Sequence, residues 1–252
     1  LIMEKLAIFG GTPVRTTKLS YGKQYIDEQD IQAVTDVLKS DYITCGPMVS
    51  KLEEKLCEIT GAKYAVAVSN GTAALHLACM AIDIKEGDEV ITTPITFAAS
   101  ANCALYCGAK PVFADINPET YNISPASIEA HITPATKAVV AVDFTGQAVE
   151  LEEIRSICRK HNLTLIEDAA HSIGTKYNAQ PVGSIADMTT FSFHPVKTVT
   201  GGEGGAITTN DENLYHKLLR LRAHGVTRNR NEMVNANDSP WYYEQVELGY
   251  NY

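Results

Sequence analysis

Short apolar runs rich in valine and isoleucine alternate with helix-like segments along most of this chain of 252 residues. We expect strands at 64–69, 89–93, 111–115, 138–143, 163–167, 188–193 and 206–209. Strands separated by helices are typical of a mostly parallel sheet whose two faces are both covered by helices. The predicted fold class is therefore α/β. The chain shows no internal repeat and no proline-rich linker, so we expect one large domain.

The segments between these runs repeat apolar residues at helical spacing. We expect helices at 27–39, 49–59, 72–82, 98–106, 149–161 and 210–223. Asp27 is a suitable N-cap for the first helix, and Gly61 is a suitable end for the second. The polar segment from Arg228 to Trp241 follows neither pattern, and we expect it to be an exposed loop.

The composition argues against several classes of protein. The net charge is -9 and no run of lysine or arginine stands out, so we expect no nucleic-acid partner. No apolar run approaches the ~18 residues that span a membrane, and the N-terminus lacks the pattern of a signal peptide. The six cysteines lack the paired spacing of a zinc site. We expect no metal, and we expect buried free thiols in a reducing cytoplasm.

Ligands of parallel sheets bind at the carboxyl ends of the strands, which draws attention to the residues that follow each strand. The segment Ser69-Asn70-Gly71-Thr72 follows a strand and opens a helix. Free N–H groups at a helix start bind phosphate, Gly71 allows close approach, and Thr72 adds a hydroxyl group. The alternative is an ordinary helix cap made by Asn70 or Thr72. No lysine follows in the pattern of a Walker loop.

An aspartate and a histidine follow another strand, in the segment IEDAAHS. Asp168 either caps a helix or faces a ligand at the strand end. Side chains alternate along a strand, so only one of Glu167 and Asp168 should face the site. His171 lies on the same face as Asp168 if the turn is helical. By itself such a histidine is more often structural than catalytic.

The stretch SFHPVKTVTGGEGGAI places one lysine between a strand and a loop with four glycines. Most loop lysines are simply solvated. Here Ser192 and Lys197 flank a turn that Pro195 stiffens, and the glycines allow the chain to reverse tightly. The glycines do not match a dinucleotide-binding GxGxxG loop, because a strand follows them instead of a helix.

A phosphate cradle, a strand-end aspartate and a lysine together match the needs of pyridoxal 5′-phosphate. Its aldehyde forms a Schiff base with a lysine, its ring nitrogen pairs with a carboxylate, and its phosphate binds a helix N-terminus. We therefore predict that the chain binds this cofactor through Gly71, Asp168 and Lys197.

Several segments of the chain together resemble the DegT/DnrJ/StrS family of sugar aminotransferases. They are YGKQYIDEQDIQAVTDVLKSDYIT, SNGTAALHLA, TTPITFAASANC, EDAAHSIGTKY, VGSIADMTTFSFHPVKTVTGGEGGAITTND and ELGYNY. The resemblance covers nearly the whole chain. It implies the fold type I, aspartate-aminotransferase-like architecture. Among the subgroups, SFHPVK followed by GEGG is most similar to the UDP-sugar 4-aminotransferases that make a precursor of pseudaminic acid.

The resemblance implies catalytic and ring-binding roles for four residues. Lys197 would form the Schiff base and later carry the proton between the cofactor carbon and the sugar carbon. Asp168 would pair with the ring nitrogen. Phe97 would stack on the ring. His171 would approach the ring's phenolic oxygen, at a position where the family often has glutamine.

It also implies phosphate-binding roles and a second subunit. Gly71, Thr72 and Ser192 would hold the phosphate of the cofactor. Asn251, in the segment GYNY, would reach the phosphate of a neighbouring subunit's cofactor. The resemblance therefore implies a homodimer with a shared active site.

The implied reaction moves an amino group from glutamate to a nucleotide-linked 4-keto-6-deoxy sugar and gives a 4-amino sugar. A UDP-4-keto-6-deoxy-N-acetylhexosamine is the acceptor that the subgroup implies.

Two features depart from the family. Cys45, in YITCGP, stands where the family usually has a polar residue, and the chain ends at Tyr252, where the family continues into a smaller C-terminal domain. We expect residues 1–252 to form an N-terminal segment and the large cofactor-binding domain.

Three alternatives remain open at this point. The chain could be a truncated cofactor-binding protein with incomplete or no aminotransferase activity. It could be a sugar 3-dehydratase of the same family, although those proteins have histidine in place of Lys197. It could also be a nucleotide-binding α/β domain without enzymatic activity, against which the missing GxGxxG and Walker patterns argue.

Overall fold

The computed structural model describes residues 5–235 and 239–252, and its centre is a seven-stranded sheet. The strands are β1 (Tyr64–Val68), β2 (Glu89–Thr92), β3 (Lys110–Phe113), β4 (Thr136–Val142), β5 (Thr164–Asp168), β8 (Met188–Ser192) and β9 (Gly205–Thr209). They lie in the order β1-β9-β8-β5-β4-β2-β3. Strands β3, β2, β4, β5 and β8 are parallel, and β9 is antiparallel to both of its neighbours. The predicted α/β class with a mostly parallel sheet is confirmed.

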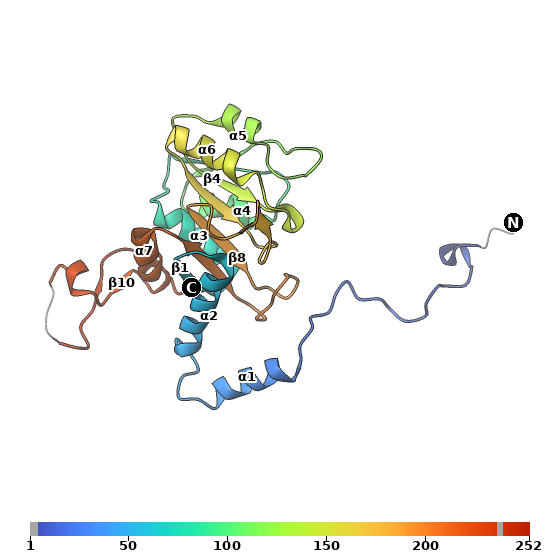
Figure 1. Cartoon of the computed structure of the whole chain (residues 1–252), viewed down its shortest axis with the longest axis horizontal. Helices are drawn as coiled ribbons and strands as arrows, with labels where there is room; N and C mark the ends of the chain where they lie inside the picture. The colour runs from blue at the N-terminus through green and yellow to red at the C-terminus, as the bar shows by residue number, and fades with distance from the viewer. Residues whose placement is uncertain (1–4, 236–238) are drawn as a thin grey trace.

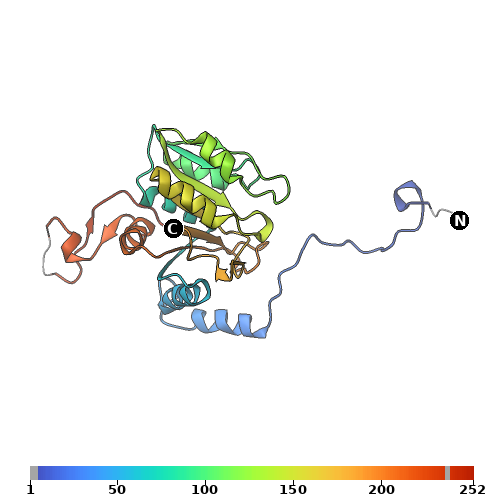
Figure 2. The ribbon, with the colours of Figure 1, turned by 45° about the horizontal axis from the view of Figure 1, so that its top comes forward.

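Helices cover both faces of the sheet (Figures 1 and 2). The helices in the described residues are α1 (Glu28–Leu38), which buries no residue, α2 (Pro47–Thr60), α3 (Gly71–Ala81), α4 (Ala99–Tyr106), α5 (Pro125–His131), α6 (Leu151–His161) and α7 (Glu212–Arg222). One face packs against α3, α4 and α7, and the other against α2, α5 and α6. None of the helices in the described residues combines the length and the apolar character needed to cross a membrane.

The alternation along β5 separates two neighbouring acidic side chains. Ile166 belongs to the core beneath α3, α4 and α7, whereas Leu165 belongs to the core beneath α5 and α6. Because side chains point to opposite faces at each step, Asp168 shares the face of Ile166 and Glu167 shares the face of Leu165. Both acids are buried, at 5% and 0% exposure.

Local signals set the ends of the helices where the sequence predicts them. Asp27 accepts hydrogen bonds from Gln29 and Asp30 N–H in a capping box at the start of α1. Gly61 ends α2 in the left-handed region, at φ 72°. The helix α5, which begins after Ser124, was not predicted.

Two expectations about single segments need correction or limits. Burial of all six thiols is wrong, because Cys45 is exposed and Cys57 and Cys107 are only partly buried. The segment from Arg228 to Trp241 contains the 3-10 helix η3 (Arg230–Glu232), and its positions 236–238 lie outside the described residues.

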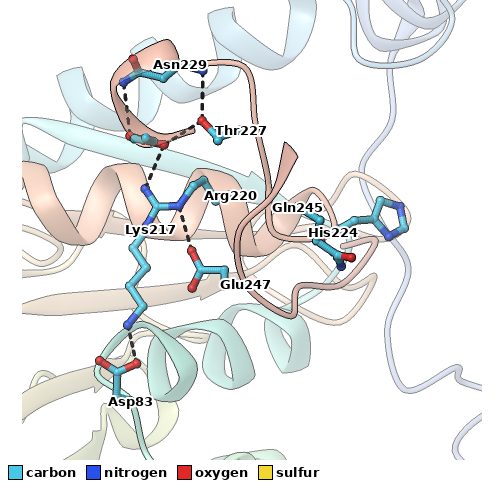
Figure 3. A network of polar contacts seen from close by, with 9 residues as sticks. Asp83, Lys217, Arg220, His224, Thr227, Asn229, Gln245 and Glu247 are labelled. Atoms are coloured by element: carbon cyan, nitrogen blue, oxygen red, sulfur yellow. Dashed lines mark hydrogen bonds and ion pairs between the residues drawn. The ribbon is translucent and has the colours of Figure 1, made fainter. Parts of the chain in front are cut away.

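The described part of that segment and the end of the chain are attached to α7 by ion pairs (Figure 3). Arg220 contacts Glu232 at 3.4 Å and Glu247 at 2.8 Å, and Lys217 contacts Asp83 at 2.6 Å beyond the end of α3. The short pair of strands β10 (Val226–Thr227) and β11 (Glu244–Gln245) lies beside this network, while β6 (Lys176–Tyr177) and β7 (Gln180–Pro181) form a hairpin elsewhere. The Arg220–Glu247 pair and the backbone hydrogen bonds from Tyr250 and Tyr252 to Leu221 O and Arg222 O hold the last residues of the chain against α7. Two further 3-10 turns are η1 (Ala7–Phe9) and η2 (Phe144–Gly146).

Candidate functional site

A cavity of about 1040 Å³ lies at the carboxyl ends of the strands, where the sequence predicts a ligand. The segments that follow β1, β2, β4, β5 and β8 all contribute to its wall. The predicted site residues that line it are Gly71, Thr72, Phe97, Asp168, His171, Ser192 and Lys197. The structure thus brings together seven of the eight residues, which lie far apart in the sequence.

Asp168 is a buried carboxyl group held by two donors. The Ser100 hydroxyl group donates to Oδ2 at 2.7 Å, and the Ala170 N–H donates to Oδ1 at 3.2 Å. Burial raises the pKa of Asp168, whereas these hydrogen bonds and the charges of Lys197 and His171 act in the opposite direction. The orientation of the carboxyl group is therefore set by the protein itself.

Ser100, in the first turn of α4, holds Asp168 in place. The helix was predicted, but this role of Ser100 was not. Ser100 is 1% exposed, and its hydroxyl oxygen lies 2.7 Å from that of Thr96. Since Ser100 donates to Asp168, Thr96 supplies the proton in the second hydrogen bond, and the three groups form a chain. The strand-end rule points to residues 94–97, which include Thr96, but it stops short of Ser100, and a serine in a small-residue helix is not a signal on its own.

Lys197 and His171 form the second polar contact of the site. Lys197 Nζ lies 2.8 Å from His171 Nε2. Burial lowers the pKa of both groups, and the charge of Lys197 lowers that of His171 further, while Asp168 raises the pKa of each. A neutral His171 can accept a hydrogen bond from the lysine through Nε2.

The loop that carries Lys197 is fixed by backbone contacts at both ends. Lys197 N–H donates to His194 O at 2.9 Å, and Phe193 N–H donates to Gly204 O at 2.8 Å. The side chain of Gln24, from the N-terminal segment, donates to Pro195 O at 2.8 Å. As the glycines predict, the chain reverses here and returns as β9.

The start of α3 is packed tightly against the end of β8. A Cβ atom added at Gly71 would lie 2.8 Å from Ser192 Cβ, so only glycine fits there without movement. Asn70 caps the helix by accepting from Ala73 N–H at 2.8 Å. In the described part of the chain the N–H groups of Gly71 and Thr72 have no partner, and they open onto the cavity. The helix cap therefore leaves these two residues at the cavity wall, and their phosphate-binding role stays a prediction.

Of the remaining residues that the sequence singles out, one lines the cavity and two do not. Phe97 lines the cavity and is 75% exposed, so its ring is free to contact a ligand. Asn251 is exposed and pairs with Ala223 in an isolated bridge. It does not line the cavity of its own chain. Cys45 is exposed with φ 48° and also lies outside the cavity wall.

An aromatic wall on one side of the cavity was also missed. It consists of His76, Tyr106, Tyr250 and Tyr252. His76 Nδ1 lies 3.1 Å from the hydroxyl oxygen of Tyr252, and the rings of Tyr250 and Tyr252 stack at 5.1 Å. The alternation of tyrosines around Asn251 in GYNY is the signal that could have revealed it.

The chemistry of these residues fits pyridoxal phosphate. An amine, a buried carboxyl group and a helix start with free N–H groups face one cavity. In the described residues no three His, Cys, Asp or Glu side chains are grouped as a metal site.

Known proteins with similar sequences share this part of the chain. SpsC, a spore coat polysaccharide biosynthesis protein of Bacillus subtilis, is 45% identical over 232 residues, which is 92% of this chain and 59% of SpsC. The UDP-4-amino-4,6-dideoxy-N-acetyl-beta-L-altrosamine transaminase of Campylobacter jejuni is 44% identical over 237 residues, which is 93% of this chain and 60% of the relative. The chain thus spans about three-fifths of the length of these curated relatives.

Solved structures of related aminotransferases have the same fold as this chain. PseC of Helicobacter pylori, an aminotransferase of pseudaminic acid biosynthesis, has a TM-score of 0.84 at 35% identity and covers 94% of this chain and 62% of its own. The PLP-form of the sugar aminotransferase Spr1654 of Streptococcus pneumoniae has a TM-score of 0.84 at 30% identity, over 93% and 62% of the two chains. The profile of the DegT/DnrJ/EryC1/StrS aminotransferase family matches residues 24–252. The chain belongs to this family of pyridoxal-phosphate-dependent aminotransferases.

Proposed function

We propose that this protein transfers an amino group from glutamate to a nucleotide-linked 4-keto-6-deoxy sugar and so makes a 4-amino sugar. One observation carries the proposal: Lys197, Asp168 and the start of α3 face the same cavity. An amine, a carboxyl group and an anion site are the three groups that pyridoxal phosphate requires.

In this proposal the start of α3 holds the phosphate of the cofactor. The free N–H groups of Gly71 and Thr72 point to the anion, and the hydroxyl groups of Thr72 and Ser192 add donors. Phe97 covers one side of the ring. When bound, the protonated ring withdraws electrons and stabilises negative charge on the carbon next to the transferred nitrogen.

Asp168 keeps the ring nitrogen protonated. The Ser100 hydroxyl group and the Ala170 N–H hold the carboxyl group in a fixed orientation, so no reorganisation is needed when the ring binds. Burial from solvent strengthens the interaction of this carboxylate with a positive partner.

Lys197 acts as the base that takes and returns the proton. Burial lowers the pKa of Lys197, which increases the neutral fraction of its amine near neutral pH. His171 Nε2, at 2.8 Å, holds the Nζ atom in place, and with the cofactor bound it would contact the ring's phenolic oxygen.

The acceptor that we favour is a UDP-4-keto-6-deoxy-N-acetylhexosamine. The transaminase names of the Campylobacter jejuni relatives and of PseC support it. The similarity to SpsC is as high, so the sugar is the least specific part of the proposal.

The active form that we propose is a homodimer. Asn251 is exposed and does not line its own cavity, although its neighbours Tyr250 and Tyr252 do. In this proposal the exposed Asn251 contacts the phosphate bound by the second subunit.

The direct test is the visible absorbance of purified protein with pyridoxal phosphate. We expect a band from the lysine-bound cofactor, its loss on addition of glutamate, and its return on addition of a 4-keto nucleotide sugar. Lys197→Ala should show no such band. A band that glutamate does not change would favour a cofactor-binding protein without aminotransferase activity. No band at all would contradict the proposal.

A second test separates binding from catalysis. Asp168→Ala should retain the absorbance band and lower the rate of amino transfer by about 100-fold or more, because the electron-withdrawing state of the ring is lost. Asp36→Ala, at an exposed position of α1, is the control and should leave the rate unchanged. A near-normal rate in Asp168→Ala would defeat the role assigned to this residue.

A further inference from the structure

Behind the site, two carboxyl groups that the proposed reaction does not use are buried against each other. Glu167 and Asp143 are both 0% exposed. Because Glu167 pairs with Ala141 of the neighbouring strand β4, Asp143, two residues further along, has its side chain on the same face of the sheet. Glu167 Oε2 accepts a hydrogen bond from the Thr189 hydroxyl group at 2.9 Å. Glu167 Oε1 is buried and has no donor within the described residues.

Asp143, in contrast, is well supplied with donors. The Val149 N–H donates to Oδ1 at 3.0 Å, and the Ser172 hydroxyl group donates to Oδ2 at 2.5 Å. Its own N–H donates to Asp168 O at 3.1 Å. Donors of this kind stabilise the ionised form, so Asp143 is the member of the pair suited to carry the negative charge.

None of the ion pairs among the described residues involves Glu167 or Asp143. Burial and the charge of Asp143 raise the pKa of Glu167, and the hydrogen bond from the Thr189 hydroxyl group acts in the opposite direction. Asp168 adds a further negative charge near Asp143. Two carboxylates in contact and away from water cannot both be ionised, because neither solvent nor a counter-ion offsets their repulsion.

We propose that Glu167 holds a proton in the folded protein and donates it from Oε1 to Asp143. The proton gives the unpartnered Oε1 atom its hydrogen bond and leaves one negative charge on the pair. Burial and the neighbouring Asp143 both raise the pKa of Glu167, which agrees with a proton on Glu167. Burial also raises the pKa of Asp143, to about 7, and the hydrogen bonds from Ser172 and Val149 act in the opposite direction, so Asp143 carries its charge above that pH.

Glu167 is thereby a positioning residue for the proposed reaction, and this consequence rests on the proposed function. The neutral acid holds Asp143, and the Asp143 N–H holds the backbone at Asp168. A second charge on the pair would lie close to Asp168 and would raise the pKa of the group that must stay ionised beside the ring.

The assignment can be tested on the unaltered protein by infrared spectroscopy. The carbonyl stretch of a protonated carboxyl group is well separated from that of a carboxylate. At pH 8, above the pKa of about 7 for Asp143, we expect one such band, and we expect it to shift when glutamate residues carry ¹³C in the side-chain carboxyl group. No protonated band, or a band that shifts only with labelled aspartate, would overturn the proposal. The infrared spectra need no cofactor, so failure of the protein to bind pyridoxal phosphate would count against the proposed function and not against the proton on Glu167.

Substitution gives an independent thermodynamic readout. Glu167→Gln keeps a donor toward Asp143 and an acceptor toward Thr189, so it should fold. A group whose pKa is raised on folding is stabilising below its unfolded-state value, near 4.5, and loses that contribution as the pH rises. Relative to Glu167→Gln, the unfolding constant of the wild type should rise about tenfold per pH unit above that value.

The control is Glu129→Gln at the surface. The contact with Lys160 lowers the pKa of Glu129, so its effect on stability should have the opposite sign, with stability lost as the pH falls. Parallel pH profiles for the wild type and Glu167→Gln would contradict a proton on Glu167. If the glutamine variant does not fold, the labelled infrared spectrum still decides the question.

Discussion

The strand-end site is held in place by a buried core, whereas the N-terminal segment is not. Val140 and Ile166 in the sheet are fully buried, whereas Ile31, Val34 and Leu38 on α1 are 51%, 61% and 68% exposed. No residue of α1 is buried, and the segment before it runs away from the sheet (Figures 1 and 2). The helix nevertheless has a complete capping box.

The difference separates local from tertiary stabilisation. Caps and apolar spacing are enough to define where α1 begins and ends, yet they bury nothing within this chain. The site residues lie at the ends of strands whose side chains are buried on both faces, so the core fixes their positions. Substitutions should therefore have very different effects in the two regions.

The largest difference should come from a pair of leucine-to-alanine changes. Leu77→Ala removes a fully buried side chain from α3 and should lower the free energy of unfolding by about 3 kcal/mol. Leu38→Ala removes an exposed side chain from α1 and should cost less than about 0.5 kcal/mol. Denaturant unfolding measures both. Equal costs would show that α1 is packed in solution.

A smaller difference should come from two glycines. Gly71→Ala places a Cβ atom 2.8 Å from Ser192 Cβ, so the start of α3 must move, at a cost of about 2 kcal/mol. The same movement should weaken cofactor binding, which absorbance titration measures. Gly22→Ala in the N-terminal segment meets no atom within 4 Å and should change neither quantity. Unchanged cofactor affinity in Gly71→Ala would remove the α3 start from the site.

The smallest difference should come from two ion pairs of α2. Arg222 contacts Glu53 at 2.6 Å and donates to Ala67 O at 2.8 Å, which joins α7, α2 and β1. Arg222→Met should cost about 1.5 kcal/mol, because it leaves partly buried acceptors without their charged donor. Lys55→Met breaks the exposed pair with Glu58 and should cost less than about 0.5 kcal/mol. If the two costs match in urea unfolding, burial is not what distinguishes the pairs.

Much of the fold could be predicted because its signals are local. The runs that became β1, β4 and β5 are short, apolar and bounded by polar residues. The antiparallel direction of β9 was not predicted, although the glycine loop before it leaves no room for a crossover helix. The helix α5 has only seven residues, and its signals, Ser124 and Pro125, are those of an ordinary turn.

The site was predictable where a residue follows a strand. Lys197 and Asp168 were found in this way, and strand alternation correctly separated Asp168 from Glu167. Ser100 could not be found, because its contact with Asp168 depends on the order in which β2, β4 and β5 lie side by side. The same holds for Asp143, whose donors Val149 and Ser172 lie in two separate segments of the chain.

Reduction of the cofactor-loaded protein with borohydride, followed by peptide mass mapping, tests the central claim most directly. The account predicts one modified residue, Lys197, and loss of the modification in Lys197→Ala with no transfer to another lysine. Modification of a different lysine, or none in a protein that binds the cofactor, would contradict it.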